Sequence, residues 1–160
     1  MTLTSRIDLA DKVRTPMIQL LNERLADTLD LYMQSKQAHW NVEGPSFIAL
    51  HELFDDVADH AAEWADTVAE RVRALGGTAE GTRQAVTERS TLPEYPRDLS
   101  SGRGHVDRLA AALADYGAKV RRAIDAADEV GDKDTADLFT EVSRGVDKDL
   151  WFVEAHLGAA

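Results

Sequence analysis

Residues 46–75 read SFIALHELFDDVADHAAEWADTVAERVRAL, a stretch that contains neither glycine nor proline. It follows Gly44-Pro45, a pair that interrupts a helix, and it is followed by Gly76-Gly77, which can supply a helix C-cap. The apolar residues inside it recur at helical intervals. We therefore predict one uninterrupted helix over about residues 46–75.

A first helix is predicted over about residues 15–40. Thr15 suits the N-cap and Pro16 the first helical position. Apolar side chains then recur at helical spacing, at Ile18, Leu21, Leu25, Leu29 and Tyr32. On the other side of the 46–75 helix, residues 78–99 hold two prolines and mixed polarity. They form a long crossover, in which GTRQAVTERS, residues 81–90, favours a short helix.

Two more helices follow the crossover. Ser100 or Ser101 can cap a third helix that ends near Gly131 and carries one apolar stripe, namely Val106, Leu109, Leu113, Tyr116, Val120 and Ile124. Asp134, with Asp137 three residues on, can start a fourth that runs to about Leu157. The predicted fold is all-α: a ferritin-like four-helix bundle over residues 15–160, with a short helix in the crossover between the second and third helices. Residues 1–14 form an N-terminal extension whose order the sequence leaves open.

The composition bounds the function. The chain has 160 residues, a formal net charge of -11 and no cysteine, so any metal must be held by nitrogen and oxygen ligands. No stretch is long and apolar enough for a membrane helix or a secretory signal, so we expect a cytoplasmic protein with no membrane partner. The negative charge repels nucleic acid and attracts hard cations.

The 46–75 helix carries two pairs of metal-binding residue types at a spacing of four: His51 with Asp55, and Asp66 with Glu70. Each pair points two ligand atoms to one place. From Asp55 to Asp66 the helix turns three times plus about 20°, so both pairs share a face, but it also advances about 16 Å. One straight helix cannot close both pairs around one metal.

A two-fold axis solves this problem. An antiparallel copy of the helix, related by an axis near residues 60 and 61, sets His51 beside the other copy's Glu70 and Asp55 beside its Asp66. Such an interface is self-complementary and builds two shared sites at once. Alanines on the same face, at positions 58, 62 and 69, would let the two helices approach closely.

His39 lies at the end of the first helix, where the Gly-Pro turn brings it near His51. It completes a set of two histidines and three carboxylates that suits iron(II), with zinc or manganese as substitutes. The alternative is that these are solvated or satisfied helix residues, as single histidines and acidic faces usually are. His60, His105 and His156 fit that alternative, because none has a partner at ligand spacing along the chain.

The segments KQAHWNVEGPSFIALHELFDD, DTVAERVRALGG and TADLFTEVSRGVDKDLWFVEAHL together resemble the Dps family of mini-ferritins over about residues 15–157. The resemblance implies a shell of twelve subunits. In it, iron(II) is oxidised by hydrogen peroxide or oxygen at inter-subunit ferroxidase sites and stored as ferric mineral. Carried over by motif, one subunit supplies His39, His51 and Asp55, and its two-fold mate supplies Asp66 and Glu70.

The resemblance also suggests roles for three further residues. Trp40 corresponds to a tryptophan near the family's iron site that can intercept oxidising equivalents; the alternative is a core aromatic at a helix end. Asp134 and Asp137 map to the three-fold pores through which iron enters; the alternative is helix capping.

DNA binding is doubtful, because members that bind DNA commonly use lysine-rich tails and this chain has none. Three hypotheses result: a ferroxidase and iron store, a nucleoid DNA-binding protein whose iron site is secondary, and a structural oligomer with an inert zinc-filled interface.

Overall fold

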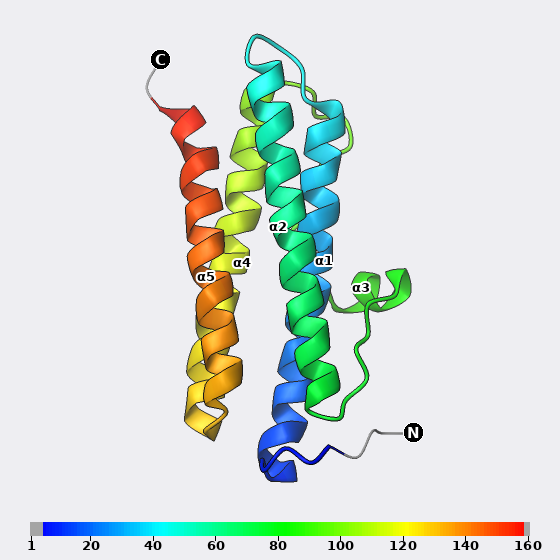
Figure 1. Cartoon of the computed structure of the whole chain (residues 1–160). Coiled ribbons are helices and arrows are strands. Elements are labelled where there is room, and N and C mark those ends of the chain that lie inside the picture. The colour runs from blue at the N-terminus through cyan, green and yellow to red at the C-terminus, as the bar shows by residue number, and fades with distance from the viewer. Residues whose placement is uncertain (1–4, 159–160) are drawn as a thin grey trace.

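The computed structural model describes residues 5–158, and in them it shows four long helices packed side by side (Figure 1). In chain order the helices are α1 (Asp11–Asn41), α2 (Phe47–Ala74), α3 (Arg83–Arg89), α4 (Gly102–Val130) and α5 (Lys133–Glu154), followed by a 3-10 turn over Ala155–Leu157. The described chain forms no strand beyond one isolated bridge between Glu43 and Ser101. The predicted all-α bundle with a short helix in its crossover is confirmed.

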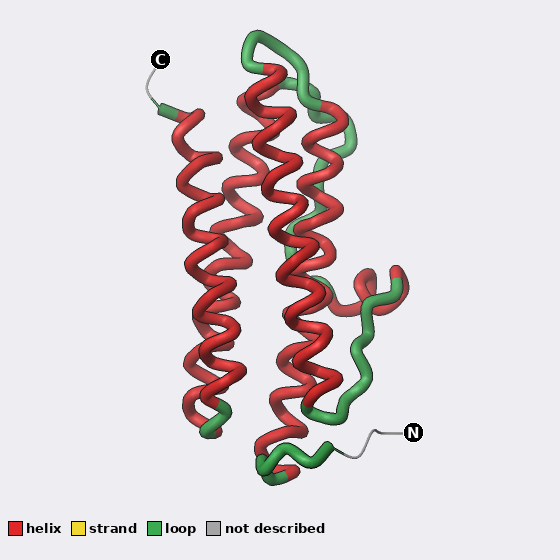
Figure 2. The backbone as a smooth tube through the Cα atoms, viewed as in Figure 1, coloured by secondary structure: helices red, strands yellow, loops and turns green. Residues whose placement is uncertain are grey.

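The helices form two hairpins, as Figure 2 shows from the short loops at the ends of each pair. α1 packs along α2 and α4 along α5, while α1 also contacts α4 and α2 contacts α5. The long crossover from α2 to α4 carries α3 along the side of α1. Both hairpins therefore present two helices to a common core.

Two helix starts differ from the prediction. α1 begins at Asp11, so residues 11–14 of the predicted extension are helical, whereas residues 1–4 lie outside the described part of the chain. Pro16 has no N–H, so the backbone hydrogen bond to the carbonyl of Lys12 is missing. This carbonyl lies in an exposed turn near the start of α1, where water can bond to it instead. The N-cap of α5 is Asp132 rather than Asp134: its carboxylate accepts from the backbone N–H of Thr135.

The core lies between the two hairpins and combines residues of the predicted stripes of α1 and α4 with apolar residues of α2 and α5. Phe54 of α2, Leu113 of α4 and Phe139 of α5 are fully buried. Burying a large apolar side chain contributes about 1.5–3 kcal/mol. A buried polar contact crosses the core between α1 and α4, a hydrogen bond of 2.6 Å between the hydroxyls of Thr28 and Tyr116. It satisfies the phenol that the tight packing would otherwise leave without a partner.

The crossover is held by buried charges. The Asp27 carboxylate, fully buried on α1, accepts from the backbone N–H of Thr91 at 2.7 Å and pairs with Arg24 at 3.1 Å. Lys119 of α4 donates to the carbonyl of Thr91 at 3.0 Å. Thr91 is thus fixed from two helices, which keeps the crossover against the bundle.

Within residues 5–158, no helix has both the length and the apolar character that crossing a membrane requires.

Candidate metal centre

The turn between α1 and α2 positions the two predicted histidine ligands. Gly44 adopts a φ of 114°, which favours glycine and reverses the chain within a few residues. The backbone of Glu43 is bonded to the start of α4, through its N–H to Ser100 at 2.9 Å and its carbonyl to Gly102 at 3.2 Å. The turn is therefore anchored, and the end of α1 lies beside the start of α2.

His39 and His51 bond to each other's backbones across this junction. His39 Nδ1 donates to the carbonyl of His51 at 2.6 Å, and His51 Nδ1 donates to the carbonyl of His39 at 2.8 Å. The rings stack with centroids 3.8 Å apart and planes 22° apart. Because a carbonyl only accepts, both Nδ1 atoms must carry hydrogen, which leaves the lone pair of each neutral ring on Nε2. Both imidazoles are held in the tautomer that binds a metal through Nε2.

Asp55 lies beside these rings and is held by a lysine. The Lys36 ammonium contacts Asp55 Oδ1 at 2.5 Å, and His39 Nδ1 is 3.9 Å from the same oxygen. The bond from Lys36 lowers the pKa of Asp55 below its usual value, and the same bond raises the pKa of Lys36. A cation thus already occupies one side of this carboxylate, and the carboxylate is kept ionised.

Trp40 follows His39 and is 67% exposed, so the alternative of a core aromatic is wrong for this chain. Lys36 lies over its ring, 5.6 Å from the centroid, and the same ammonium contacts Asp55, so the indole lies near the predicted ligands.

Asp66 and Glu70 are exposed on α2, Asp66 three turns beyond Asp55 and Glu70 one turn further, and the single chain does not bring them to the His51–Asp55 pair. Within residues 5–158, no three histidine, aspartate or glutamate side chains of one chain are placed to hold a metal ion together. The structure therefore brings three of the five predicted ligands, His39, His51 and Asp55, close together, and their binding of a metal stays a prediction. That the other two come from a second copy stays a prediction.

The surface around Asp66 is apolar and hollowed. A groove of about 410 Å³ between α1 and α2 is lined by Leu25, Leu29, Tyr32, Ala62, Ala65, Asp66, Ala69, Ala79 and Gly81. Ala62 and Ala69 line this groove, and the approach of a second helix to them stays a prediction. Ala58 does not line it: it is fully buried inside the chain, because the face of α2 that carries it turns toward the other helices.

The predicted pore residues lie at the opposite end of the bundle from the α1–α2 turn, as the start of α5 shows (Figure 1). Asp134 and Asp137 are exposed there. Arg71 of α2 pairs with the capping residue Asp132 at 2.7 Å and lies 4.0 Å from Asp134. Asp134 is therefore not the cap, and its carboxylate faces solvent.

Sequence reasoning missed the partners of two other histidines. His60 contacts the Asp149 carboxylate of α5 at 3.0 Å, and the buried His105 bonds through Nδ1 to the Tyr95 hydroxyl at 2.7 Å. The His60 pair joins residues far apart in the chain, so no local spacing could have signalled it. His60 and His105 therefore lack partners at ligand spacing along the chain, as predicted, but each has a partner that the fold brings to it from elsewhere.

Comparison with known proteins agrees with this architecture. The ferritin-like domain family matches residues 18–160. The DNA protection during starvation protein of Agrobacterium fabrum is 47% identical over 150 residues, which is 94% of this chain and 93% of that protein. The corresponding protein of Brevibacillus brevis is 35% identical over 138 residues, 86% of this chain and 92% of that one.

Solved structures give the same result. DpsC from Streptomyces coelicolor superposes with a TM-score of 0.94 at 35% identity, covering 100% of this chain and 94% of that one. Dps from Microbacterium arborescens in its high iron form gives a TM-score of 0.89 at 34% identity, covering 98% and 100%. The similarity extends over the whole bundle, in sequence as well as in backbone, and the chain belongs to the Dps family of ferritin-like proteins.

Proposed function

We propose that the protein oxidises iron(II) at dinuclear sites shared between two copies of the chain and stores the ferric product inside a shell of twelve copies. The observation that carries this proposal is the pair of hydrogen bonds that His39 and His51 donate through Nδ1, which leaves both Nε2 lone pairs free for a metal in two rings that lie near the Asp55 carboxylate. Two imidazoles with carboxylates form a donor set that iron(II) accepts.

In the proposed site His39, His51 and Asp55 come from one copy and bind the tighter iron. Glu70 of the second copy bridges or shares that iron, and its Asp66 helps hold the other. The neutral rings add no charge, so the three carboxylates give the site a charge of about -3 to balance two divalent ions. The ions are substrate here. Zinc or manganese could occupy the same ligands as substitutes.

Two irons in one site suit hydrogen peroxide as oxidant. One peroxide needs two electrons, and each iron(II) supplies one as it becomes iron(III). With two protons the peroxide O–O bond breaks to give two waters, so no radical need be released. Oxygen is the alternative oxidant. Trp40, which is exposed beside the site, would intercept oxidising equivalents that escape the irons.

Entry and storage depend on the assembly. The chain carries a net charge of -11, and twelve copies in a shell would attract cations strongly. Exposed carboxylates at Asp134 and Asp137 would line the pores. The name of the Agrobacterium relative, a DNA protection during starvation protein, fits a protein that shields DNA by consuming iron(II) and peroxide together.

The first test is the anaerobic rate of iron(II) oxidation by stoichiometric peroxide, with Glu70→Gln compared with wild type. We expect at least tenfold slower oxidation in the variant, because a carboxylate that contacts both irons loses its charge. Glu129→Gln is the matched control: it removes the same charge from an exposed position on α4, and it should oxidise iron like the wild type.

Oligomer size is measured for every variant, so that loss of the shell is separated from loss of the site. If wild type and Glu70→Gln both match protein-free buffer while the shell is intact, the shared site is inert, and the structural oligomer with bound zinc becomes the better account.

A further inference from the structure

α2 carries a second histidine–carboxylate arrangement on a different face from the proposed shared site. His60 Nδ1 lies 3.1 and 3.0 Å from the two carboxylate oxygens of Asp149, which belongs to α5. Asp149 is only 3% exposed, and burial raises its pKa. His60 is the only hydrogen-bond partner of the Asp149 side chain in the described part of the chain. This buried carboxylate therefore serves to hold one imidazole.

That contact fixes the chemistry of the ring. With Nδ1 donating to a carboxylate, the neutral imidazole keeps its lone pair on Nε2, and a carboxylate partner makes that nitrogen a stronger ligand. The His60 side chain is 43% exposed, and its Nε2 makes no hydrogen bond within residues 5–158. A carboxylate that orients an imidazole in this way is the usual support of a metal-binding histidine.

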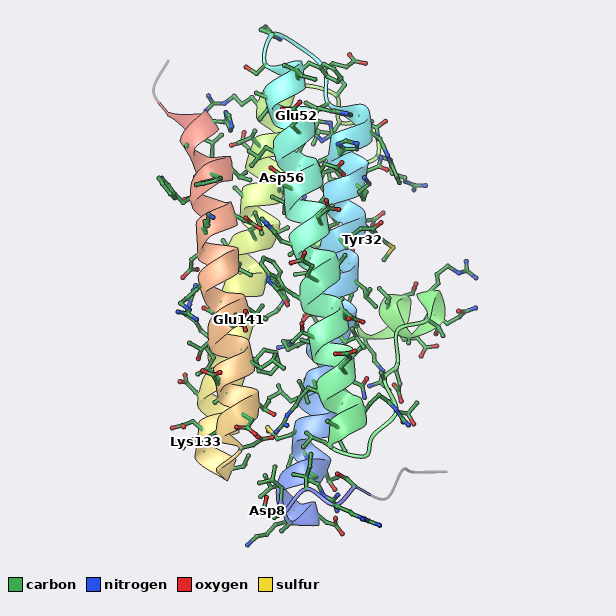
Figure 3. The ribbon with its side chains drawn as sticks, viewed as in Figure 1. Asp8, Tyr32, Glu52, Asp56, Lys133 and Glu141 are labelled. Carbon is green, nitrogen blue, oxygen red and sulfur yellow. The ribbon has the colours of Figure 1, made fainter. Side chains whose placement is uncertain are left out.

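A second donor lies one turn away. Asp56 precedes His60 by four residues, the same spacing that relates His51 to Asp55, so both side chains lie on one face of α2, one turn apart. Its carboxylate is exposed, has no ion pair in the described chain, and acts on the ionisation of Asp149, so it lies near that residue. Figure 3 shows Asp56 on the side of α2 turned toward α5.

The His60 ring also lies near the Trp64 ring, which is one turn further along α2. His60 and Trp64 have centroids 6.1 Å apart with planes at 30°, and Trp64 lies against Gly145 of α5, where an added Cβ would come within 2.6 Å of the indole. The imidazole is thus held by α5 through Asp149 and by its own helix through Trp64. A donor fixed in this way loses little freedom when it binds an ion.

We propose that His60 Nε2 and the Asp56 carboxylate bind a divalent transition-metal ion on the α2–α5 face, with Asp149 orienting His60 and solvent completing the coordination. Nitrogen and oxygen donors of this kind take iron(II), cobalt(II) or zinc(II). Asp56 and His60 lie about 100° and 140° around α2 from Asp55, so this position is separate from the shared site. It is formed within one chain and needs no second copy.

Cobalt(II) is the probe, and Trp64 is the reporter. In the assembled protein carrying Trp40→Phe and Trp151→Phe, Trp64 is the remaining tryptophan of the three. Adding His51→Gln and Asp55→Asn removes the shared site. Cobalt(II) quenches a nearby indole, so titration should give saturable quenching, and calorimetry should count one ion per chain.

Three variants in this background test the assignment. Asp56→Asn and His60→Gln should each weaken cobalt(II) binding at least tenfold, and Asp149→Asn should weaken it by about tenfold through loss of orientation. Asp56 is exposed and makes no ion pair, so its variant keeps the fold even if a change at the buried Asp149 does not. Asp125→Asn, exposed on α4, removes the same charge and should leave binding unchanged.

Quenching that does not saturate, or that survives Asp56→Asn and His60→Gln in folded protein, overturns the proposal. Because the shared site is absent from this background, that result would leave the proposed oxidation at Glu70 untouched.

Discussion

The histidines of this chain differ in what their Nδ1 atoms contact, and that contact sets what each ring can do. His39 and His51 donate to carbonyls and keep a free Nε2 near the surface. His60 contacts a buried carboxylate, whereas His105 is fully buried and bonds to a tyrosine hydroxyl. Burial lowers the pKa of His105, so this ring is neutral in the fold.

His105 should make stability depend on pH. Its folded pKa is lowered, so the unfolded chain binds a proton more readily, and stability falls as pH drops below about 6.5. The sign means that the contribution is present above that pH and lost below it. Thermal unfolding between pH 7.5 and 5 should show a steeper loss for wild type than for His105→Gln, by at most about tenfold in the unfolding equilibrium per pH unit. Parallel curves would show that His105 does not titrate differently on unfolding.

Lys36 should compete with metal at the proposed shared site. Its ammonium contacts the Asp55 carboxylate, so an arriving ion must displace it. Met has a side chain of similar length to that of lysine but carries no charge. Replacing Lys36 by Met should therefore raise the affinity for zinc(II) by about two- to fivefold, the range expected for a partly exposed ion pair. Calorimetry on assembled protein measures this. Equal or weaker binding in the variant would mean that Lys36 supports the site by holding Asp55 in place.

At the scale of helices, the sequence predicts most of the fold because its signals are local. Gly44-Pro45 and Gly131 end helices by their own conformations, and Ser101 caps α4 as predicted. Local signals do not show which residue caps α5, because Asp132 and Asp134 stand only two residues apart and both suit an N-cap. Asp132 becomes the cap because Arg71, on a distant helix, pairs with it at 2.7 Å.

In the candidate site too, the sequence predicts contacts between residues close in the chain but not contacts between distant helices. His39, His51 and Asp55 come together through one turn and one helix spacing, both of which the sequence shows. Asp149 is paired with His60 by the packing of α5 on α2, and no spacing along the chain predicts that contact. The contribution of Asp66 and Glu70 depends on a second copy and stays a prediction.

The contact between α2 and α5 gives a prediction about helix packing. An added methyl at Gly145 would lie 2.6 Å from the Trp64 ring, so α5 must shift or the indole must turn. Gly145→Ala should lower the free energy of unfolding by about 1–3 kcal/mol despite its better helix propensity. Gly81→Ala is the control, because its nearest neighbour is a leucine methyl at an ordinary 3.4 Å. Equal stability of the two variants, measured by denaturant unfolding, would contradict the tight fit.

At the scale of the whole molecule, the net charge bears on whether the protein binds DNA. With a net charge of -11, the chain should not bind DNA tightly. A mobility shift assay with assembled protein should show no shift at moderate salt and at most a weak one at low salt. A shift that persists at moderate salt would favour the hypothesis of a nucleoid DNA-binding protein. DNA protection would then involve contact as well as removal of iron and peroxide.

The separation of Asp66 and Glu70 from the histidine end of α2 has a genetic consequence. Suppose one version of the chain lacks His51 and another lacks Glu70, so that each alone is inactive. Where the two versions pair, one of the two proposed shared sites combines both defects, but the other receives an intact histidine end and an intact carboxylate end. Co-expression should therefore restore part of the oxidation that neither version shows by itself, a complementation that a site contained in one chain could not give.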